Sequence, residues 1–224
     1  MASIGIASLW WNHTELLPDF VRMMGVGGWD KLILIDDASA EEANLAYHDA
    51  VAELGPNASV LRMEHNDALR AGNAGVEALG TDIVIGMVND LVMTDERWLE
   101  WAVEGIERGI IQGPQCWFRG MIYVDGCMTV MMREDWELLG GADAEHYAHP
   151  GYWADTDFSL RAQQHGMIVR PTRSGIRHLV NYSSGDGPAY LAENEDNYQK
   201  YVVRSLFAVR TQLPVPFRNR AEAQ

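Results

Sequence analysis

Two short apolar runs each end abruptly in acidic residues, and this feature constrains the fold more than any other. The run LILI at 32–35 is followed by two aspartates, and the run IVIGMV at 83–88 is followed by an asparagine and an aspartate. Short β-branched runs are typical of strands that are buried on both faces of a parallel sheet. Ligands of open α/β sheets bind outside the carboxyl ends of such strands. The acidic residues are therefore expected at a ligand crevice.

Predicted strands and helices alternate along the first half of the chain. Ser39 is expected to cap a helix together with Glu42, three residues on, as a capping box. Alternating strands and helices form parallel sheets with helices on both faces. The sequence thus predicts an α/β fold with a mostly parallel central sheet. The expected strands are 4–10, 32–35, 60–63 and 83–88, and helices are expected near Pro18, from Ser39, over 68–79 and from Thr94.

The second half has a less regular pattern. A loop at 140–153 is rich in His, Tyr and Trp, and it separates two predicted helices. A long helix over 189–210 could pack on the domain or on another subunit, which would make a homo-oligomer. The remaining expected elements are strands at 121–124, 128–132, 167–170 and 176–179 and helices at 134–139 and 155–165.

Composition narrows the function classes. The chain has 17 basic and 32 acidic residues, a net charge of −15, which repels nucleic acid phosphates. Two cysteines are too few for a disulfide framework, so a reduced, cytoplasmic compartment is the simpler expectation. The sequence shows neither a signal peptide pattern nor an apolar stretch of the roughly 20 residues that a membrane-spanning helix needs.

Both polar pairs at the strand ends allow a structural and a functional interpretation. Asp36 and Asp37 could accept hydrogen bonds from N–H groups of the next helix, or one of them could bind a base or a ribose. Asn89 and Asp90 could simply begin a loop. A carboxylate aimed into a crevice loses hydration, however, unless a cation or a donor meets it. Mg²⁺ or Mn²⁺ would do so, because such ions take oxygen ligands and complete their shell with water and phosphates.

A third polar cluster lies in the second half. Asp155 stands at the start of a predicted helix, where an acid complements the helix dipole but could also take a proton from an acceptor hydroxyl. The preceding loop, with His149, Tyr152 and Trp153, is a candidate site for a second substrate. His178 follows a predicted strand; a single histidine is more often structural, but a metal role gains support from Asp90.

In their order along the chain, these segments resemble the nucleotide-sugar glycosyltransferases of the GT-A fold, in particular family 2. The resemblance covers residues 2–185 and rests on several motifs. They are Asp36-Asp37-Ala38-Ser39, Ala71-Gly72-Asn73-Ala74-Gly75, Asn89-Asp90-Leu91, the passage from Gly126 through Arg133 to Leu139-Gly140-Gly141, the block from Asp155 to Arg161, and His178 with Ser183.

The resemblance implies a role for each matching residue. Asp37 would contact the nucleotide base, Asn73 would lie under the nucleotide, and Asn89 would lie near the ribose or sugar. Asp90 and His178 would bind a divalent cation, Mn²⁺ or Mg²⁺. Asp155 would be the general base.

Two departures from the family pattern concern the metal and the block that contains the base. The metal motif has Asn first and Leu third, so Asp90 is its only carboxylate. Ala154 stands where an acid is common. The metal affinity is therefore expected to be weak.

The domain boundaries follow from the same resemblance. A GT-A domain is expected over 1–185, with a nucleotide-binding half at 1–112 and an acceptor half at 113–185. The segment 186–213 would be a helix that packs on the domain, and the tail 214–224 is a candidate for disorder.

The sequence thus predicts a metal-dependent glycosyltransferase that moves a hexosyl or pentosyl group with inversion. The donor would be a UDP-, GDP- or dTDP-linked sugar, and the acceptor a glycan, a lipid-linked sugar, a protein or a modified nucleobase. Because the metal motif has a single carboxylate, one alternative is a GT-A protein that binds nucleotides or acts as a scaffold without turnover. A nucleotidyltransferase is a third interpretation, but the basic, Gly-rich loop expected for a triphosphate is missing.

Overall fold

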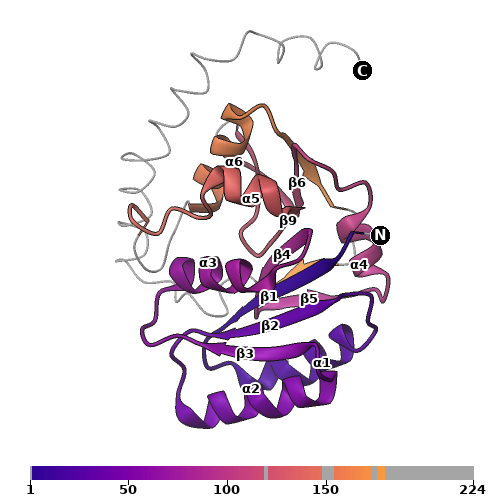
Figure 1. The fold of residues 1–224 in the computed structure, drawn as a ribbon, viewed down its shortest axis with the longest axis vertical. Coiled ribbons are helices and arrows are strands. Elements are labelled where there is room, and N and C mark those ends of the chain that lie inside the picture. Colours follow the sequence, from indigo (N-terminus) through magenta and orange to yellow (C-terminus); the bar gives the residue numbers. More distant parts are fainter. Residues whose placement is uncertain (1, 119–120, 148–153, 173–175, 180–224) are drawn as a thin grey trace.

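The computed structural model describes residues 2–118, 121–147, 154–172 and 176–179 (Figure 1). Within these residues, seven strands form the main sheet in the order β10-β6-β9-β4-β1-β2-β3. All neighbouring pairs are parallel except those of β9, which runs antiparallel to both β4 and β6. The strands are β1 (Ile4–Trp10), β2 (Lys31–Asp36), β3 (Ala58–Arg62), β4 (Ile83–Val88), β6 (Ile110–Gly113), β9 (Met128–Met132) and β10 (Ile168–Pro171).

Two small antiparallel ribbons accompany the main sheet. β5 (Leu91–Met93) pairs with β11 (Ile176–His178), and β7 (Gln115–Phe118) pairs with β8 (Met121–Val124). The first ribbon joins two segments that are more than 80 residues apart in the chain. It places the end of β11 beside the residues that follow β4.

Helices cover both faces of the sheet, as the alternating pattern predicted (Figure 1). One apolar cluster packs α1, α2 and α4 on the first face, and a second cluster packs α3, α5 and α6 on the other. The helices are α1 (Leu17–Met24), after the 3₁₀ turn η1 (Thr14–Leu16), then α2 (Glu41–Leu54), α3 (Ala68–Leu79), α4 (Trp98–Val103), α5 (Arg133–Leu139) and α6 (Ala154–Gln164).

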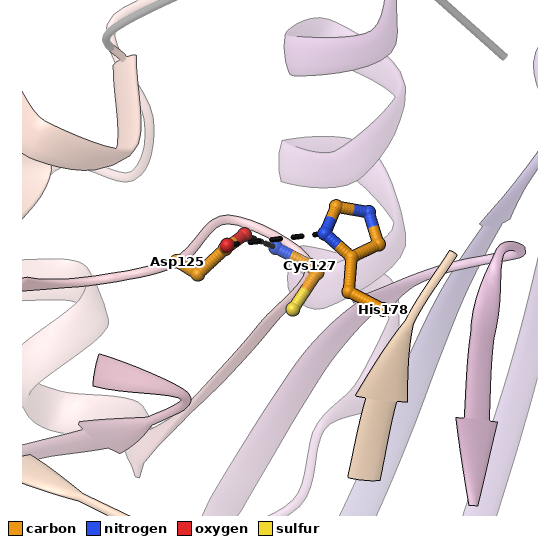
Figure 2. Close-up of side chains that lie close together, drawn as sticks. All are labelled: Asp125, Cys127 and His178. Carbon is orange, nitrogen blue, oxygen red and sulfur yellow. Dashed lines mark hydrogen bonds and ion pairs between the residues drawn. The ribbon is translucent and has the colours of Figure 1, made fainter. Parts of the chain in front are cut away.

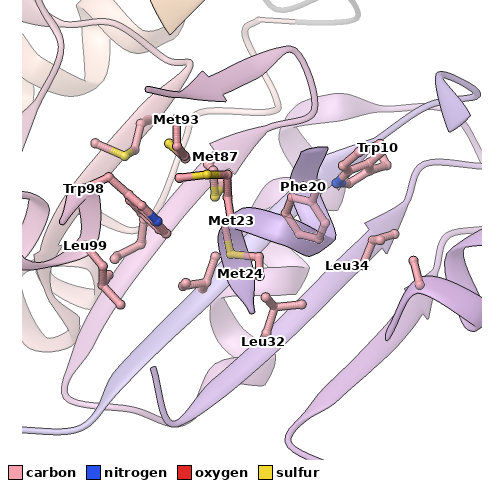
Figure 3. Close-up of a cluster of buried hydrophobic side chains, with 14 of the residues drawn as sticks. Trp10, Phe20, Met23, Met24, Leu32, Leu34, Met87, Met93, Trp98 and Leu99 are labelled. Atoms are coloured by element: carbon pink, nitrogen blue, oxygen red, sulfur yellow. The ribbon is translucent and has the colours of Figure 1, made fainter. Parts of the chain in front are cut away.

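Side chains of β2 point alternately to the two faces of the sheet, so this strand contributes to both apolar clusters. Leu32 and Leu34 belong to the first cluster, which Figure 3 shows around Trp10 and Phe20. Ile35 points to the other face and belongs to the second. Burying each large apolar side chain contributes about 1.5–3 kcal/mol, so both faces hold the sheet in place. On the second face α3 approaches closely at Gly75, where a Cβ would collide with the Ile35 side chain.

The strand register brings the carboxyl ends of the central strands to one edge. Trp10 is paired with Asp36 across β1 and β2, and Leu9 is paired with Val88 across β1 and β4. The residues after β2 and after β4 therefore both emerge at this edge, on either side of β1. The crevice position predicted from the sequence is thus the one that the fold provides.

Some local predictions were wrong. Ser39 does not cap α2, which begins at Glu41 without a side-chain cap; its hydroxyl instead accepts from the Asn12 N–H at 3.0 Å. Thr94 does not cap α4, which begins at Trp98. Strands β5, β6 and β7 were not predicted, because runs of three and four residues carry little periodicity. The long helix at 189–210 and the tail lie outside the described residues.

None of the helices in the described ranges combines the length and the apolar character that a membrane crossing requires.

Candidate active site

The carboxylates at the end of β2 are held by the protein itself. Asp36 is fully buried, and its two oxygens accept from the Ser39 N–H at 2.8 Å and the Asn44 side-chain amide at 2.7 Å. The Arg62 guanidinium lies 3.6 Å from the same carboxylate. Hydrogen bonds of this kind satisfy a buried charge. The structural interpretation of this pair therefore describes Asp36 well.

Asp37 turns toward α3. Its carboxylate accepts from the Asp67 N–H at 2.8 Å, immediately before the first residue of that helix, and the residue is 2% exposed. Ala38 follows with a φ of 57°, in the left-handed region that makes the chain leave the strand sharply. Asp37 thus fixes the start of α3. Its role in contacting a base stays a prediction.

The end of β4 is organised differently, through residues distant in the chain. Leu91 pairs with His178 across the small ribbon, and the backbone carbonyl of Asp90 accepts from the Leu179 N–H at 2.9 Å. The Asp90 carboxylate, 5% exposed, then lies 3.2 Å from His178 Nε2. Among the described residues, His178 is the one side chain that meets this carboxylate. The two residues that sequence reasoning assigned to a metal are therefore neighbours.

Asn89 adds an unpaired donor at the same edge. Its side-chain nitrogen Nδ2 is buried and has no hydrogen-bond partner among the described residues. A buried N–H without an acceptor costs about 1–3 kcal/mol. Asn89 lines a small pocket together with α1 and β5, so an acceptor for this atom could come from a ligand at this edge.

A third residue of this cluster, Asp125, was missed by sequence reasoning. It lies in the turn between β8 and β9, and its Oδ2 is 3.8 Å from His178 Nδ1 (Figure 2). Asp125, Cys127 and His178 each offer one potential ligand atom, all within 4.8 Å of one another. An acid in a short turn gives no periodic signal, so only the fold reveals its position.

These charges shift one another's ionisation. Ion pairing with Asp125, and next with Asp90, raises the pKa of His178 to about 10. Burial opposes ionisation of Asp125, but the contact with His178 and the Cys127 N–H outweigh it and lower its pKa to about 2. Without a metal, the imidazole is therefore a cation between two carboxylates.

Asp155 contacts the same turn. Its Oδ2 accepts from the Gly126 N–H at 3.1 Å, and its Oδ1 accepts from the Thr156 N–H at 2.7 Å. Burial raises the pKa of Asp155 to about 6, and the Asp125 charge adds to the rise. A carboxylate with such a pKa can accept a proton near neutral pH.

Asn73 and Arg161 hold the turn after α5. The Asn73 amide donates to the Ala142 carbonyl at 2.8 Å and accepts from the Ala142 N–H at 2.9 Å. Arg161 donates to the carbonyls of Leu139 and Gly141. Any contact of Asn73 with a donor would be made in addition to this pair. An open groove lined by α3 and residues 139–145 adjoins it.

The chain is similar to known glycosyltransferases in sequence pattern and in fold. Residues 29–135 match the family model for Glycosyl transferase family 2. The mannosyltransferase PcManGT from Pyrobaculum calidifontis, solved with GDP-Man and Mn²⁺, has 13% identity and a TM-score of 0.64, over 94% of this chain and 73% of its own. The fold is GT-A. The resemblance to glycosyltransferase family 2 is confirmed.

Two further structures show the same fold. Glucosyl-3-phosphoglycerate synthase from Mycobacterium tuberculosis, in complex with Mn²⁺, UDP and phosphoglyceric acid, has 16% identity and a TM-score of 0.64, over 96% of this chain and 80% of its own. TarS from S. aureus has 12% identity and a TM-score of 0.62, over 89% of this chain but only 44% of its own. No curated protein gives a significant match.

The residues present fit the divalent cation that the GT-A fold implies. Asp90 offers a carboxylate oxygen and His178 an imidazole nitrogen, both suitable for Mn²⁺. The unpaired Asn89 nitrogen, at the end of the same strand, could meet a phosphate or hydroxyl oxygen. The predicted acceptor residues His149, Tyr152 and Trp153 lie outside the described residues, so their role stays a prediction.

Proposed function

We propose that this chain is a metal-dependent glycosyltransferase that moves a sugar from a nucleotide-sugar donor to an acceptor hydroxyl. The observation that carries the proposal is the placement of Asp90 and Asp155. His178, the partner of Asp90, lies 3.8 Å from Asp125 of the 125–127 turn, and Asp155 accepts a hydrogen bond from Gly126 of the same turn. A cation-binding pair and a proton acceptor thus share one edge of the sheet.

Donor binding would involve residues at both strand ends. Asp37 would contact the base, and the free N–H of Asn89 would donate to the ribose or the sugar. Asp90 and His178 would hold Mn²⁺ or Mg²⁺, which when bound neutralises the diphosphate and favours its departure. The solved relatives that contain GDP-Man or UDP with Mn²⁺ support this assignment.

Asp155 would act on the acceptor. Its carboxylate takes the proton of the acceptor hydroxyl as the oxygen attacks the anomeric carbon. The C–O bond to the sugar forms on the face opposite to the nucleotide, and the bond to the diphosphate breaks. One displacement of this kind inverts the anomeric configuration.

The first test is a thermal-shift screen of the whole chain with UDP, GDP and dTDP and their sugars, each with Mn²⁺ and with a chelator. One nucleotide is expected to raise Tm, with a further rise in Mn²⁺, because a ligand that binds only the folded state stabilises it. Asp90→Ala should lose the Mn²⁺ increment. Asp49→Ala, which changes an exposed acid on α2, should retain it.

Different outcomes separate the rival interpretations. No stabilisation by any nucleotide at millimolar concentration would contradict the proposal. Stabilisation without a Mn²⁺ increment, together with no release of nucleoside diphosphate from its sugar, would favour the binding or scaffolding protein that the single carboxylate of the metal motif suggests.

A further inference from the structure

The imidazole of His178 has a different carboxylate at each of its nitrogens. Nε2 lies 3.2 Å from Asp90 Oδ1, and Nδ1 lies 3.8 Å from Asp125 Oδ2. The two nitrogens are on different edges of the ring. If one nitrogen binds a cation, only the acid beside that nitrogen can bind the same cation. One acid faces the metal-binding nitrogen, and the other faces the nitrogen behind it.

The distances indicate which nitrogen would bind the metal. Neighbouring ligand atoms around an octahedral ion with bonds of about 2.0–2.1 Å are separated by about 3 Å. The spacing of 3.2 Å between Asp90 Oδ1 and His178 Nε2 matches this value. A ring that binds a cation through Nε2 must carry its proton on Nδ1. Nδ1 faces the Asp125 carboxylate (Figure 2), so a proton on this nitrogen would point toward Asp125.

Asp125 is itself held in position. Its Oδ1 accepts from the Cys127 N–H at 2.9 Å, and its own N–H donates to the Pro114 carbonyl at 2.7 Å. Its carbonyl accepts from the Met128 N–H at 3.2 Å. With Oδ1 engaged in the turn, Oδ2 is the oxygen that faces the histidine. The carboxylate cannot rotate away without losing the hydrogen bond to Cys127.

We propose that Asp125 is the positioning residue of the metal site, accepting the Nδ1 proton of His178 so that Nε2 faces the cation beside Asp90. The proposal rests on the proposed metal-dependent function. Metal-binding histidines commonly donate their second N–H to a carboxylate, which fixes the tautomer and makes the ligand nitrogen more basic. Asp125 would thus raise the metal affinity that the Asn89-Asp90-Leu91 motif loses by having a single carboxylate, and it would do so without contacting the metal.

A competing arrangement predicts a different result in the same test. Asp125, Cys127 and His178 could together bind a cation through Nδ1. A thiolate in the ligand set would favour Zn²⁺ over Mn²⁺. In that arrangement Cys127 would matter and Asp90 would not.

The test measures Mn²⁺ affinity directly on the whole chain, by electron paramagnetic resonance of the free ion, with and without UDP or GDP. Asp125→Ala is expected to weaken Mn²⁺ binding 10- to 100-fold. Asp125→Asn should lose only a few-fold, because its amide oxygen can still accept the Nδ1 proton. Asp90→Ala should abolish measurable binding, and Cys127→Ser should leave it unchanged. Circular dichroism checks that each variant is folded.

Nitrogen NMR of the wild type provides a second readout that does not depend on a variant folding. With histidine labelled in the ring and diamagnetic Mg²⁺ added at saturating concentration, His178 should show a bound Nε2 and a protonated Nδ1. The signal is assigned by its loss in His178→Gln. A bound Nδ1, or a Cys127→Ser variant that binds more weakly, would overturn the proposal.

Two results distinguish this proposal from the proposed function. If the wild type binds Mn²⁺ and Asp125→Ala binds it equally well, only the positioning role is wrong. If the wild type binds no Mn²⁺ with or without nucleotide, both proposals fail. An Asp125→Asn variant as weak as Asp90→Ala would make Asp125 a direct ligand and overturn the positioning role.

Discussion

The strand ends of β2 and β4 each carry a buried aspartate, but the two carboxylates find their partners in opposite ways. Asp36, after β2, receives hydrogen bonds from Ser39 and Asn44, within eight residues along the chain. Asp90, after β4, meets the side chain of His178, 88 positions further on, and no backbone N–H among the described residues binds its carboxylate. An acid that is satisfied locally supports the fold, whereas a buried acid short of donors suits a cation.

Asp155 is a third buried acid that we assign to function. Its substitution is expected to have the largest effect on turnover. Asp155→Asn keeps the size and the hydrogen-bond acceptor but removes the proton-accepting carboxylate. Turnover of the donor identified by thermal shift is expected to fall about 10²- to 10⁴-fold. The release of nucleoside diphosphate measures it, and the Mn²⁺-dependent rise in Tm should persist.

Asp49→Asn is the matched control for this loss, because it removes an exposed carboxylate on α2. It should turn over the donor at the wild-type rate. If Asp155→Asn retained more than a tenth of the wild-type turnover, another group would have to be the base.

The contrast also shows what could be predicted from the sequence. Strands 4–10 and 83–88 and helix 68–79 were predicted to the residue, because each has a strong apolar pattern and a clear boundary. The position of Asp36 and Asp37 followed from the strand before them. These features depend on residues close together in the chain.

The rest depends on contacts between distant segments. The family resemblance, and not the strand pattern, indicated that His178 belongs with Asp90. Their 3.2 Å approach depends on the β5–β11 ribbon, which no local signal specifies. Asp125 gave no signal at all, since it occupies a turn. The capping role of Ser39 failed because Asn12, 27 residues earlier, binds its hydroxyl.

The second prediction compares the two strand ends by stability. Asp36→Ala leaves the Ser39 N–H and the Asn44 amide without their acceptor in a buried position, so unfolding free energy should fall by about 3 kcal/mol. Asp90→Ala removes an acid whose partner, His178, is 27% exposed and keeps Asp125. We expect a loss below about 1 kcal/mol. Urea denaturation of the metal-free proteins measures both.

The stabilities of these two variants can contradict the interpretation that Asp36 is structural and Asp90 is functional. Equal losses of stability in Asp36→Ala and Asp90→Ala would mean that Asp90 is as structural as Asp36. A gain of stability in Asp90→Ala would strengthen the contrast between the two strand ends. It would show that Asp90 lowers the stability of the metal-free fold.

The smallest expected effect concerns pH and Asp155. Its pKa is raised to about 6 in the folded state by burial and by the Asp125 charge, from an ordinary value near 4 in the unfolded chain. The folded state therefore binds the proton more tightly than the unfolded chain. The resulting stabilisation is present below about pH 4 and is lost as the pH rises to about 6. The Tm of the wild type relative to Asp155→Asn should fall across this window.

Activity should change in the opposite direction, around the folded-state pKa, because the base must be ionised to accept a proton. In the wild type, kcat/KM at saturating Mn²⁺ should rise about tenfold between pH 5 and a plateau above about pH 7, with its midpoint near pH 6. Asp155→Asn should lack both this rise and the accompanying loss of stability. If the stability difference stayed constant from pH 4 to 6 while activity still rose, a group other than Asp155 would control the pH profile.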